Sequence, residues 1–598
     1  MFLCMYLRKH IRQKDGASYE YWTLVETVRT ARGPRQRIVG NLGKLPGLDR
    51  EERIGWEEVG RVLSGKGPER QPELFSSDPE PPDWARVDLR QVRAERLRRF
   101  GDAYLALAVW RRLGLDTLLA DILPAGRAEI GWDALACLLV LARFCEPSSE
   151  LAIAEHFYGT TALDDLLGIP PEKVNDDRLY RALDALLPHK DAICSHLAGR
   201  YAEWFGTQVD FLLYDVTSTY FEGQAAGDSL AARGYSRDHR PDCPQVCIGL
   251  AATPEGLPVG YEVFAGNRAD VTTLEDMVAL LEGRYGQARR IWVFDRGIVS
   301  EDNLAMLRSR GARYVVGTPK SMLRKFEAQL LAGGWEQAAE SGVEVRTATH
   351  PDFAGDSFIL CRSLQRREKE HAILATQADR LDAKLAAIQA SVRAGRLRDR
   401  ATAERRIGRW LGKFSRAEDL FRVELVPAEG PLEDMRVERR QEAESWAALA
   451  QGAYLLRTNV EGEDPARLWQ WYIQLAQVEA AFRTSKSDLG LRPVYHQKAR
   501  RVEAHILVCF LALVLWRSLE QWMSAKGLGT CARRLVAEMR EVRSLDIVLG
   551  VTDRGAVRLR VVGQPEKPLQ VLLQHLGLPL PNCPKRTGIA ENVVQNLG

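Results

Sequence analysis

Residues 211–215 read FLLYD, and residues 291–295 read IWVFD. Each segment is a run of apolar, β-prone residues that ends on an aspartate. Such runs are typical of buried strands, and a charge at the end of one is costly to bury unless something pairs with it. Asp215 and Asp295 are therefore the first candidates for a functional site.

The sequence around these two runs has the pattern of an α/β fold. A helix is expected at 273–285. Strands are expected at 211–216, 246–253, 257–264, 291–295 and 313–317. The first strands follow one another as in hairpins, whereas the later ones alternate with helical segments. We therefore predict a mixed sheet rather than an all-parallel one.

A third acid, Glu479, lies in a segment with helical periodicity at 465–486. Tyr472 precedes it by seven residues and Lys486 follows it by seven, so on one continuous helix all three share a face. By geometry alone, a solvated stripe on an amphipathic helix explains this pattern more readily. A turn cap likewise explains either aspartate taken alone. Only the combination of three acids points to a site.

Three carboxylates of this kind suit a pair of divalent cations. Adjacent strands lie about 4.8 Å apart, so acids on neighbouring strands can share an ion. Hard oxygen ligands favour Mg²⁺ or Mn²⁺ over zinc. Enzymes that cut and rejoin phosphodiester bonds commonly use two such ions. The predicted catalytic and metal-binding residues are Asp215, Asp295 and Glu479.

Length and composition indicate a folded protein with several domains. The chain has 598 residues, of which 45% are hydrophobic and 27% charged. A single core stops growing at roughly 250 to 300 residues, so more than one is expected. The longest apolar stretch, 504–516, is shorter than a membrane span and is flanked by arginines, which predicts a buried helix and a cytoplasmic protein with no membrane contact.

Changes of pattern along the chain predict seven segments. We expect a basic β-hairpin unit at 1–64, a linker at 65–87, a helical DNA-binding domain at 88–205, the first part of the α/β core at 206–319, an inserted β-rich and helical subdomain at 320–450, the second part of the core with the glutamate helix at 451–525, and a C-terminal region at 526–598. Within the last region, 535–549 is expected to be helical and 556–562 to be β-prone.

The distribution of charge says more than its total. The net charge is only +3, which by itself does not indicate a nucleic-acid partner. Basic residues crowd the segment from Arg8 to Arg37 and again the segment from Arg393 to Lys413. The first cluster fits contacts with DNA phosphates. The second fits a DNA contact and a solvated helix face about equally well.

The motifs around the three acids resemble the DDE transposases of bacterial insertion sequences, in the subgroup with a Tyr-Arg-Glu-Lys signature. The motifs are YDVTSTYFEG at 214–223, VFDRG at 293–297 and YIQLAQVEAAFRTSK at 472–486. Further matches are GYSRDHRPD at 234–242 with Gln245, Gly266-Asn267 with Asp270 and Thr273, and LRPVYH at 491–496 with His505. The resemblance runs from the basic N-terminus to the last helices.

The resemblance implies a ribonuclease-H-like core interrupted by an insertion before the glutamate helix. It implies a transposase that binds the ends of an insertion sequence and uses two Mg²⁺ or Mn²⁺ ions for strand cleavage and strand transfer. The implied partners are the terminal inverted repeats, target DNA and a second copy of the chain in the end-paired complex. The expected location is the bacterial cytoplasm, in association with the nucleoid.

One position departs from the signature. Its arginine should follow Tyr472 by three residues, where this chain has Leu475. Through the resemblance, Tyr472 and Lys486 are expected to contact DNA, and the nearby Arg483 is a candidate to replace the missing arginine.

Two other functions fit many of the same residues. A nuclease with this core would cleave DNA without strand transfer. A domesticated DNA-binding regulator would keep the core only as a scaffold, although the presence of all three acids argues against that.

Overall fold

The computed structural model describes residues 5–14, 17–30, 33–43, 87–124, 130–287, 289–338, 342–551 and 555–590. The chain forms two compact units. Unit 1 comprises Met1–Arg112, Cys137–Leu179 and Ser518–Gly598, and unit 2 comprises Leu113–Ala136 and Tyr180–Arg517. The three acidic residues all belong to unit 2.

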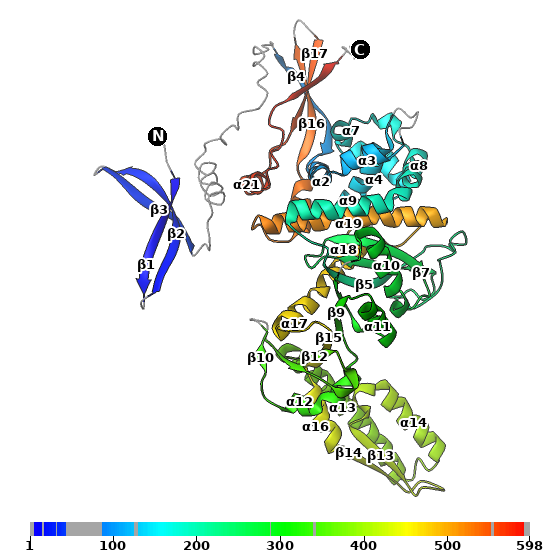
Figure 1. Cartoon of the computed structure of the whole chain (residues 1–598). Coiled ribbons are helices and arrows are strands. Elements are labelled where there is room, and N and C mark those ends of the chain that lie inside the picture. The colour runs from blue at the N-terminus through cyan, green and yellow to red at the C-terminus, as the bar shows by residue number, and fades with distance from the viewer. Residues whose placement is uncertain are drawn as a thin grey trace. The chain divides into compact units, whose positions relative to one another are not determined.

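A nine-stranded mixed sheet forms the framework of unit 2 (Figure 1). Its order is β10-β11-β12-β15-β9-β8-β5-β6-β7. The strands are β5 (Phe211–Tyr220), β6 (Gln245–Ala252), β7 (Pro258–Ala265), β8 (Ile291–Phe294), β9 (Arg313–Gly317), β10 (Glu336–Gln337), β11 (Val343–Ala348), β12 (Ser357–Ser363) and β15 (Ala453–Thr458). β5, β6 and β7 pair antiparallel, whereas β8 lies parallel to β5 and β9 parallel to β8. The prediction of an α/β fold with a mixed sheet is confirmed.

The central strands are buried because they are apolar along their whole length. Every residue of β8 is buried, and Trp292 and Phe294 are among the largest fully buried side chains of the described residues. Both faces of such a strand must be covered, as is typical of a parallel strand between helical layers. The edge strand β7 has partly exposed residues instead.

Helices connect and cover the strands. Their bounds are α2 (Gly101–Arg112), α3 (Leu115–Ile122), α4 (Trp132–Cys145), α7 (Leu163–Leu167), α8 (Asp176–Leu186), α9 (Lys190–Phe205), α10 (Leu274–Tyr285), α11 (Glu301–Ser309), α12 (Glu327–Leu331), α16 (Gln441–Ala450), α17 (Pro465–Ile473), α18 (Leu475–Ser487), α19 (Ala499–Ala525), α20 (Ala532–Arg540) and α21 (Lys567–His575). In the described ranges α19 alone is long and apolar enough to cross a membrane, but 89% of its most apolar 18-residue window is buried. The prediction of a buried helix at 504–516 is confirmed.

Two strands of the expected inserted subdomain extend the central sheet. Residues 343–348 and 357–363, which we expected in the inserted subdomain, are strands β11 and β12 of the nine-stranded sheet. Most of the remaining part of the expected insertion lies between β12 and its antiparallel neighbour β15. β12 and β15 are far apart in the sequence, so no local pattern of residues predicts that they pair.

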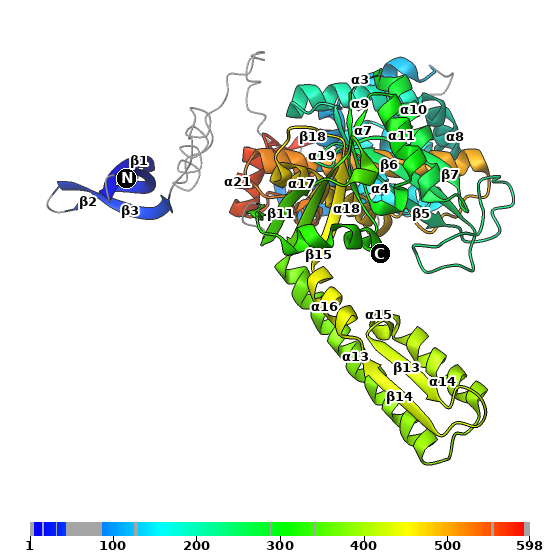
Figure 2. The same cartoon turned by 60° about the horizontal axis from the view of Figure 1, so that its bottom comes forward.

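Residues 364–440 of this insertion form what we call the arm (Figure 2). It contains α13 (Leu364–Arg393), α14 (Arg400–Lys413), α15 (Ser415–Glu418), β13 (Phe421–Val426) and β14 (Asp434–Arg439). The arm has a hydrophobic core of its own, built mainly from α13, α14 and the β13–β14 hairpin.

Two β-sheets belong to unit 1. The first is a three-stranded antiparallel sheet of β1 (Met5–Lys14), β2 (Ala17–Thr30) and β3 (Gly33–Gly43), which agrees with the predicted N-terminal β unit. The predicted linker lies outside the described residues except for Val87. The second sheet has the order β18-β17-β16-β4, with β4 (Val87–Arg99), β16 (Arg543–Val551), β17 (Gly555–Val562) and β18 (Lys585–Ala590).

The second sheet corrects two helical predictions. Residues 88–99, expected to begin a helical domain, form β4, and residues 543–549, expected to be helical, belong to β16. β4 contains five Arg and two Leu, residues that favour helix, but it pairs antiparallel with β16 far away in sequence. β16 alternates buried and half-buried residues, the period of a strand.

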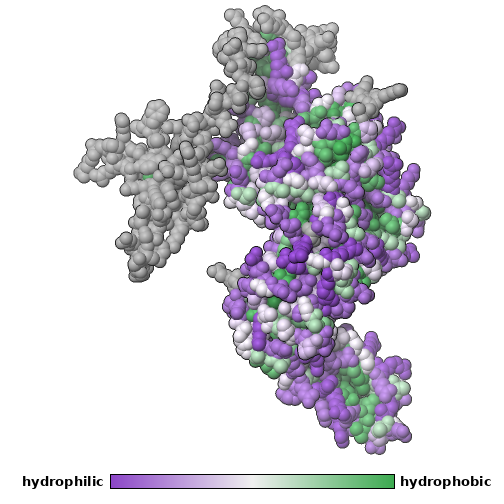
Figure 3. Space-filling view, in the orientation of Figure 1, coloured by the Kyte–Doolittle hydropathy of each residue, from purple (hydrophilic) through white to green (hydrophobic). Residues whose placement is uncertain are grey.

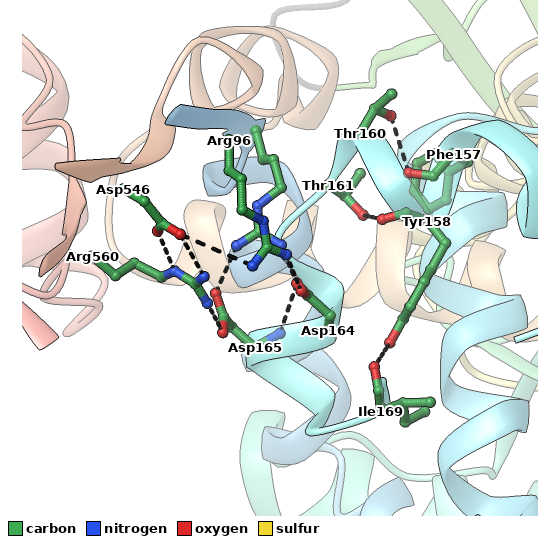
Figure 4. A network of polar contacts seen from close by, with 11 residues as sticks. Arg96, Phe157, Tyr158, Thr160, Thr161, Asp164, Asp165, Ile169, Asp546 and Arg560 are labelled. Carbon is green, nitrogen blue, oxygen red and sulfur yellow. Dashed lines mark hydrogen bonds and ion pairs between the residues drawn. The ribbon is translucent and has the colours of Figure 1, made fainter. Parts of the chain in front are cut away.

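A network of ion pairs joins this sheet to α7 (Figure 4). Asp546 of β16 is fully buried and accepts hydrogen bonds from Arg560 of β17 at 2.7 and 3.0 Å. Arg560 also contacts Asp165 of α7, and Arg96 of β4 donates to Asp164 at 2.9 Å. Burial opposes ionisation of Asp546, but its hydrogen bonds to Arg560 prevail and lower the pKa of that carboxyl. The network joins β4 to the C-terminal strands β16 and β17 through α7.

Candidate active site

Strand register brings Asp215 and Asp295 side by side. β5 and β8 run parallel, and the last pair of residues in their shared ladder is Tyr214 with Phe294. The next residue on each strand is an aspartate. The two carboxylates therefore emerge at the same level of adjacent strands, although 80 residues separate them in the chain.

Asp215 lies within a strand and not at the end of one, which corrects our expectation. β5 continues to Tyr220 because it pairs with β6, where Leu250 lies opposite Asp215. One carboxylate oxygen of Asp215 accepts a hydrogen bond from the backbone N–H of Val216 at 2.8 Å. Only the pairing with β8 ends at this point.

Asp295 directly follows β8 and is exposed. It occupies the position before the 3₁₀ turn Arg296–Ile298, but its side chain makes no capping hydrogen bond there. It accepts instead a hydrogen bond of 3.0 Å from the hydroxyl group of Tyr472. The turn-cap explanation for this aspartate therefore does not hold.

Glu479 comes from α18, which packs against β5 (Figure 1). Leu475, Val478 and Phe482 are buried on the packed face of this helix, and Glu479 is exposed. Its charge is among the smaller causes that raise the pKa of Asp215, after burial.

The three acids influence one another electrostatically. The pKa of Asp215 rises from its ordinary value of 3.8 to about 7, chiefly because burial disfavours the charged form. The Val216 N–H and Arg237 oppose this rise, whereas the nearby charges of Asp295 and Glu479 add to it. A carboxylate shifted by burial and by two like charges is typical of functional sites.

The helix that carries the glutamate is broken, which corrects a second expectation. α17 ends at Ile473 and α18 begins at Leu475, so Tyr472 and Glu479 lie on separate helices and not on one face of a single helix. On its own helix, Tyr472 donates its hydroxyl hydrogen bond to Asp295. Whether Tyr472 also contacts DNA stays a prediction.

A glycine makes room for this tyrosine. Gly317 ends β9, and a Cβ atom there would lie 2.5 Å from the Tyr472 hydroxyl oxygen and 3.2 Å from a carboxylate oxygen of Asp295. No real side chain tolerates the shorter distance. We did not single out Gly317 from the sequence, because its role depends on a helix more than 150 residues away.

Lys486 is held by a residue whose role the sequence did not reveal. Its ammonium group donates to Asp238 at 2.8 Å, and Arg492 contacts the same carboxylate oxygen. The Asp238 side chain is only 2% exposed, and its second oxygen has no hydrogen-bond partner. Burial lowers the pKa of Lys486, and the bond to Asp238 partly offsets that effect. The GYSRDHRPD motif was the available signal for Asp238.

The residue that departs from the signature, Leu475, is buried. Leu475, at the place of the expected arginine, is 9% exposed and packs inside unit 2. Arg483, the candidate replacement, is exposed on α18. Arg492 lies next to Lys486 through their common partner Asp238, so it supplies a second positive charge that sequence spacing did not indicate.

A pocket of about 430 Å³ opens beside Asp295. Basic and aromatic side chains line much of it, among them Arg296, Lys320, Tyr454 and Trp469. Positive charge and flat apolar rings together suit a polyanionic chain that carries bases. The pocket thus extends the site from the acids toward β15 and α17.

The donor set fits hard divalent cations. Three carboxylates offer only oxygen ligands, and a carboxyl that burial and two like charges keep protonated gains most from a nearby cation. Within the ranges that the structure describes, no three His, Cys, Asp or Glu side chains stand close enough to enclose an ion. Without a cation the like charges of the three carboxylates repel, and to share an ion they would have to come closer together.

Two family models match parts of the chain. The family model described as a transposase DDE domain matches residues 210–515, which include all three acids. The model described as the IS1634 family transposase N-terminal domain matches residues 7–73. No curated protein matches the chain. A solved structure described as "Cryo-EM structure of piggyBac transposase synaptic complex with hairpin DNA" is similar with a TM-score of 0.36 and 9% identity, over 75% of this chain and 82% of that one.

Proposed function

Because the chain belongs to the family of transposases with a DDE domain, we propose that Asp215, Asp295 and Glu479 form its catalytic centre. The protein is a DNA transposase of the insertion-sequence type, an enzyme that cleaves DNA strands and joins them to new sites. One observation carries the assignment of the residues. The β5–β8 register places Asp215 and Asp295 side by side. After burial, the charges of Asp295 and Glu479 both raise the pKa of Asp215.

We infer that β7-β6-β5-β8-β9 is the ribonuclease-H-like core expected from the resemblance. Support comes from its order of antiparallel hairpin strands followed by parallel strands linked through α10 and α11. The arm between β12 and β15 fits the insertion before the glutamate helix.

We propose that the three carboxylates bind two Mg²⁺ or Mn²⁺ ions. When bound, such ions activate an attacking hydroxyl and stabilise the leaving oxygen of a phosphodiester. Asp215 must lose its proton before it serves as a ligand. Tyr472 holds Asp295 in place through its hydroxyl group, and Gly317 leaves the space that this contact requires.

We further propose that Lys486 and Arg492 bind a phosphate of the cleaved strand. Asp238 binds the side chains of Lys486 and Arg492 at one carboxylate oxygen and balances part of their positive charge. The two side chains are therefore already close together when a phosphate binds. This pair would take over the contact that Leu475 removes from the Tyr-Arg-Glu-Lys signature. Arg483 and Tyr472 remain weaker candidates for contacts with the same strand.

The partners follow from the reaction. The transposon ends, target DNA and, through the resemblance, a second copy of the chain are the proposed components of the working complex in the bacterial cytoplasm. The basic β1–β3 sheet is a candidate for end binding, and the matched N-terminal family model supports it.

The test is cleavage of a duplex that carries the ends of the element. Asp215→Asn, Asp295→Asn and Glu479→Gln are each expected to abolish Mg²⁺- or Mn²⁺-dependent nicking while the protein still binds the duplex. Asp302→Asn, at an exposed site on α11, is the control and should cleave normally. Robust nicking by Asp295→Asn would disprove the assignment of the catalytic centre.

A further inference from the structure

We propose that the exposed face of α14 in the arm binds the backbone of target DNA. This inference depends on the proposed transposase function in one respect: the function identifies the bound polyanion as DNA. Its physical basis is the charge and shape of the helix itself. Residues 393–416 contain nine basic and two acidic residues, against a net charge of +3 for the whole chain.

The helix carries four basic residues on the side opposite its buried apolar residues. Ala403 and Ile407 are buried in the core of the arm, with Trp410 packed beside them. Arg405, Arg406, Arg409 and Lys413 are all exposed. At 100° per residue these four lie within about one third of the circumference. They form a single basic face, about 12 Å long by the rise per residue.

In the described part of the chain none of these four cations is ion-paired, since no carboxylate lies within 4 Å of the charged groups of Arg405, Arg406, Arg409 or Lys413. By contrast, Arg393 pairs with Asp434 at 2.7 Å and, on α14 itself, Arg400 pairs with Glu404 at 3.6 Å. The pKa of Asp399, just before the helix, is lowered by its hydrogen bonds from Thr402 and also by the charge of Arg405. Positive charge still predominates on this face, so it is suited to an external polyanion.

Part of the basic face is pre-ordered by an aromatic ring. Lys413, Arg409 and Lys384 of α13 stand 5.3, 5.9 and 5.0 Å from the centre of the Trp410 ring. Trp410 in turn stacks on Phe414. The ring holds the stems of these side chains against the arm, which reduces the entropy cost of ordering them around a phosphate.

Two glycines keep the edge of this face low. Gly408 and Gly412 lie along one flank of the basic residues, and a Cβ atom at either would meet no other atom within 4 Å. Packing therefore does not require glycine there, although glycine weakens a helix interior. The absence of side chains lets a nucleic-acid backbone approach the helix closely beside the arginines.

The chemistry favours target DNA over a transposon end or an acidic protein. The basic face of α14 carries only Arg and Lys, which neutralise phosphates in DNA of any sequence, so we infer contacts that are tolerant of sequence. A target must be accepted irrespective of sequence, whereas an end must be recognised. Hydrophilic side chains cover much of the visible face of the arm, at the lower end of Figure 3.

The first test measures binding of a labelled random-sequence 40-base-pair duplex to the full chain by fluorescence anisotropy. The variant R405Q/R406Q/R409Q should bind at least ten-fold more weakly at about 0.15 M salt. Its log–log salt slope should fall by about 2 to 3, at roughly 0.9 for each phosphate that the variant no longer neutralises. The control R380Q/R422Q/R436Q removes the same charge from other exposed positions of the arm and should weaken binding less than two-fold.

A second variant, G408Q/G412Q, keeps every charge and improves helix propensity. Its melting temperature should be unchanged or higher, but its affinity for the duplex should fall several-fold. Unaltered binding by both variants would overturn the proposal, as would an equally weakened control. A change in self-association with no change in DNA binding would assign the face to a second copy instead.

A strand-transfer assay separates the target from the ends. The α14 variant should still nick an end-carrying duplex but join it to target DNA at least ten-fold more slowly. An equal decrease in nicking and joining would reject the target assignment. Failure of the proposed catalytic centre would show in the acid variants alone, because Asp215→Asn should bind the random duplex normally.

Discussion

Replacement of Asp215 by asparagine should stabilise the protein while it abolishes cleavage. The pKa of this carboxyl is about 7 in the folded protein against an ordinary value of 3.8. Each pKa unit corresponds to about 1.4 kcal/mol, so at alkaline pH the ionised side chain costs the folded state up to about 4 kcal/mol. Asparagine has nearly the same shape and no charge to bury, so the variant avoids this cost.

The sign of the pH dependence follows from proton uptake. Between about pH 4 and pH 7 the folded protein keeps the proton on Asp215, whereas the unfolded chain has released it. Stability from this group is therefore fully present below pH 4, falls as the pH rises through this window, and levels off above pH 7. The variant should equal the native protein near pH 4 and exceed it most at pH 8.

Metal binding should depend on pH in the opposite direction. With a pKa of about 7, roughly one Asp215 side chain in eleven is ionised at pH 6 and ten in eleven at pH 8. The affinity for Mn²⁺ should therefore be about ten-fold higher at pH 8. Asp215→Asn should bind Mn²⁺ weakly and with little change across this range.

The first assay is urea unfolding of unit 2 at pH 4.5 and pH 8, monitored by tryptophan fluorescence. The second is titration with Mn²⁺, monitored by electron paramagnetic resonance. Asp302→Asn, an equal change of charge on the exposed surface of α11, serves as control and should alter neither. An Asp215→Asn variant that is no more stable than the native protein at pH 8 would refute the cost assigned to this carboxylate. A Mn²⁺ affinity that is flat between pH 6 and pH 8 would refute it equally.

Three further substitutions test the surroundings of the acids and the second sheet. Gly317→Ala should displace the Tyr472 hydroxyl, because the new Cβ atom would lie 2.5 Å from it, and single-turnover cleavage should slow about ten-fold with DNA affinity unchanged. Arg492→Gln should weaken binding of the cleaved strand by about 1.5 to 3 kcal/mol, measured as a higher KM, whereas Arg492→Lys should recover part of the affinity. Arg560→Met removes the main partner of the fully buried Asp546 and should lower the free energy of unfolding of unit 1 by about 3 to 5 kcal/mol in urea. A loss of less than about 1 kcal/mol would mean that the network in Figure 4 is not cooperative.

The sequence by itself determined the elements that carry the chemistry. Short apolar runs with strand periodicity located β5 and β8, and each run carried its aspartate with it. The motifs around Asp215, Asp295 and Glu479 indicated the family that the comparisons then showed. These features are local, because a strand's periodicity and a motif are both written in consecutive residues.

Only the tertiary structure decided how these elements meet. Pairing between distant strands made residues 88–99 a strand against their helical propensity and moved β11 and β12 into the central sheet. Long-range contacts likewise join Tyr472 to Asp295 and Lys486 to Asp238. Each of these depends on partners dozens to hundreds of residues away, and packing energy from such partners outweighs propensities worth less than about 1 kcal/mol per residue.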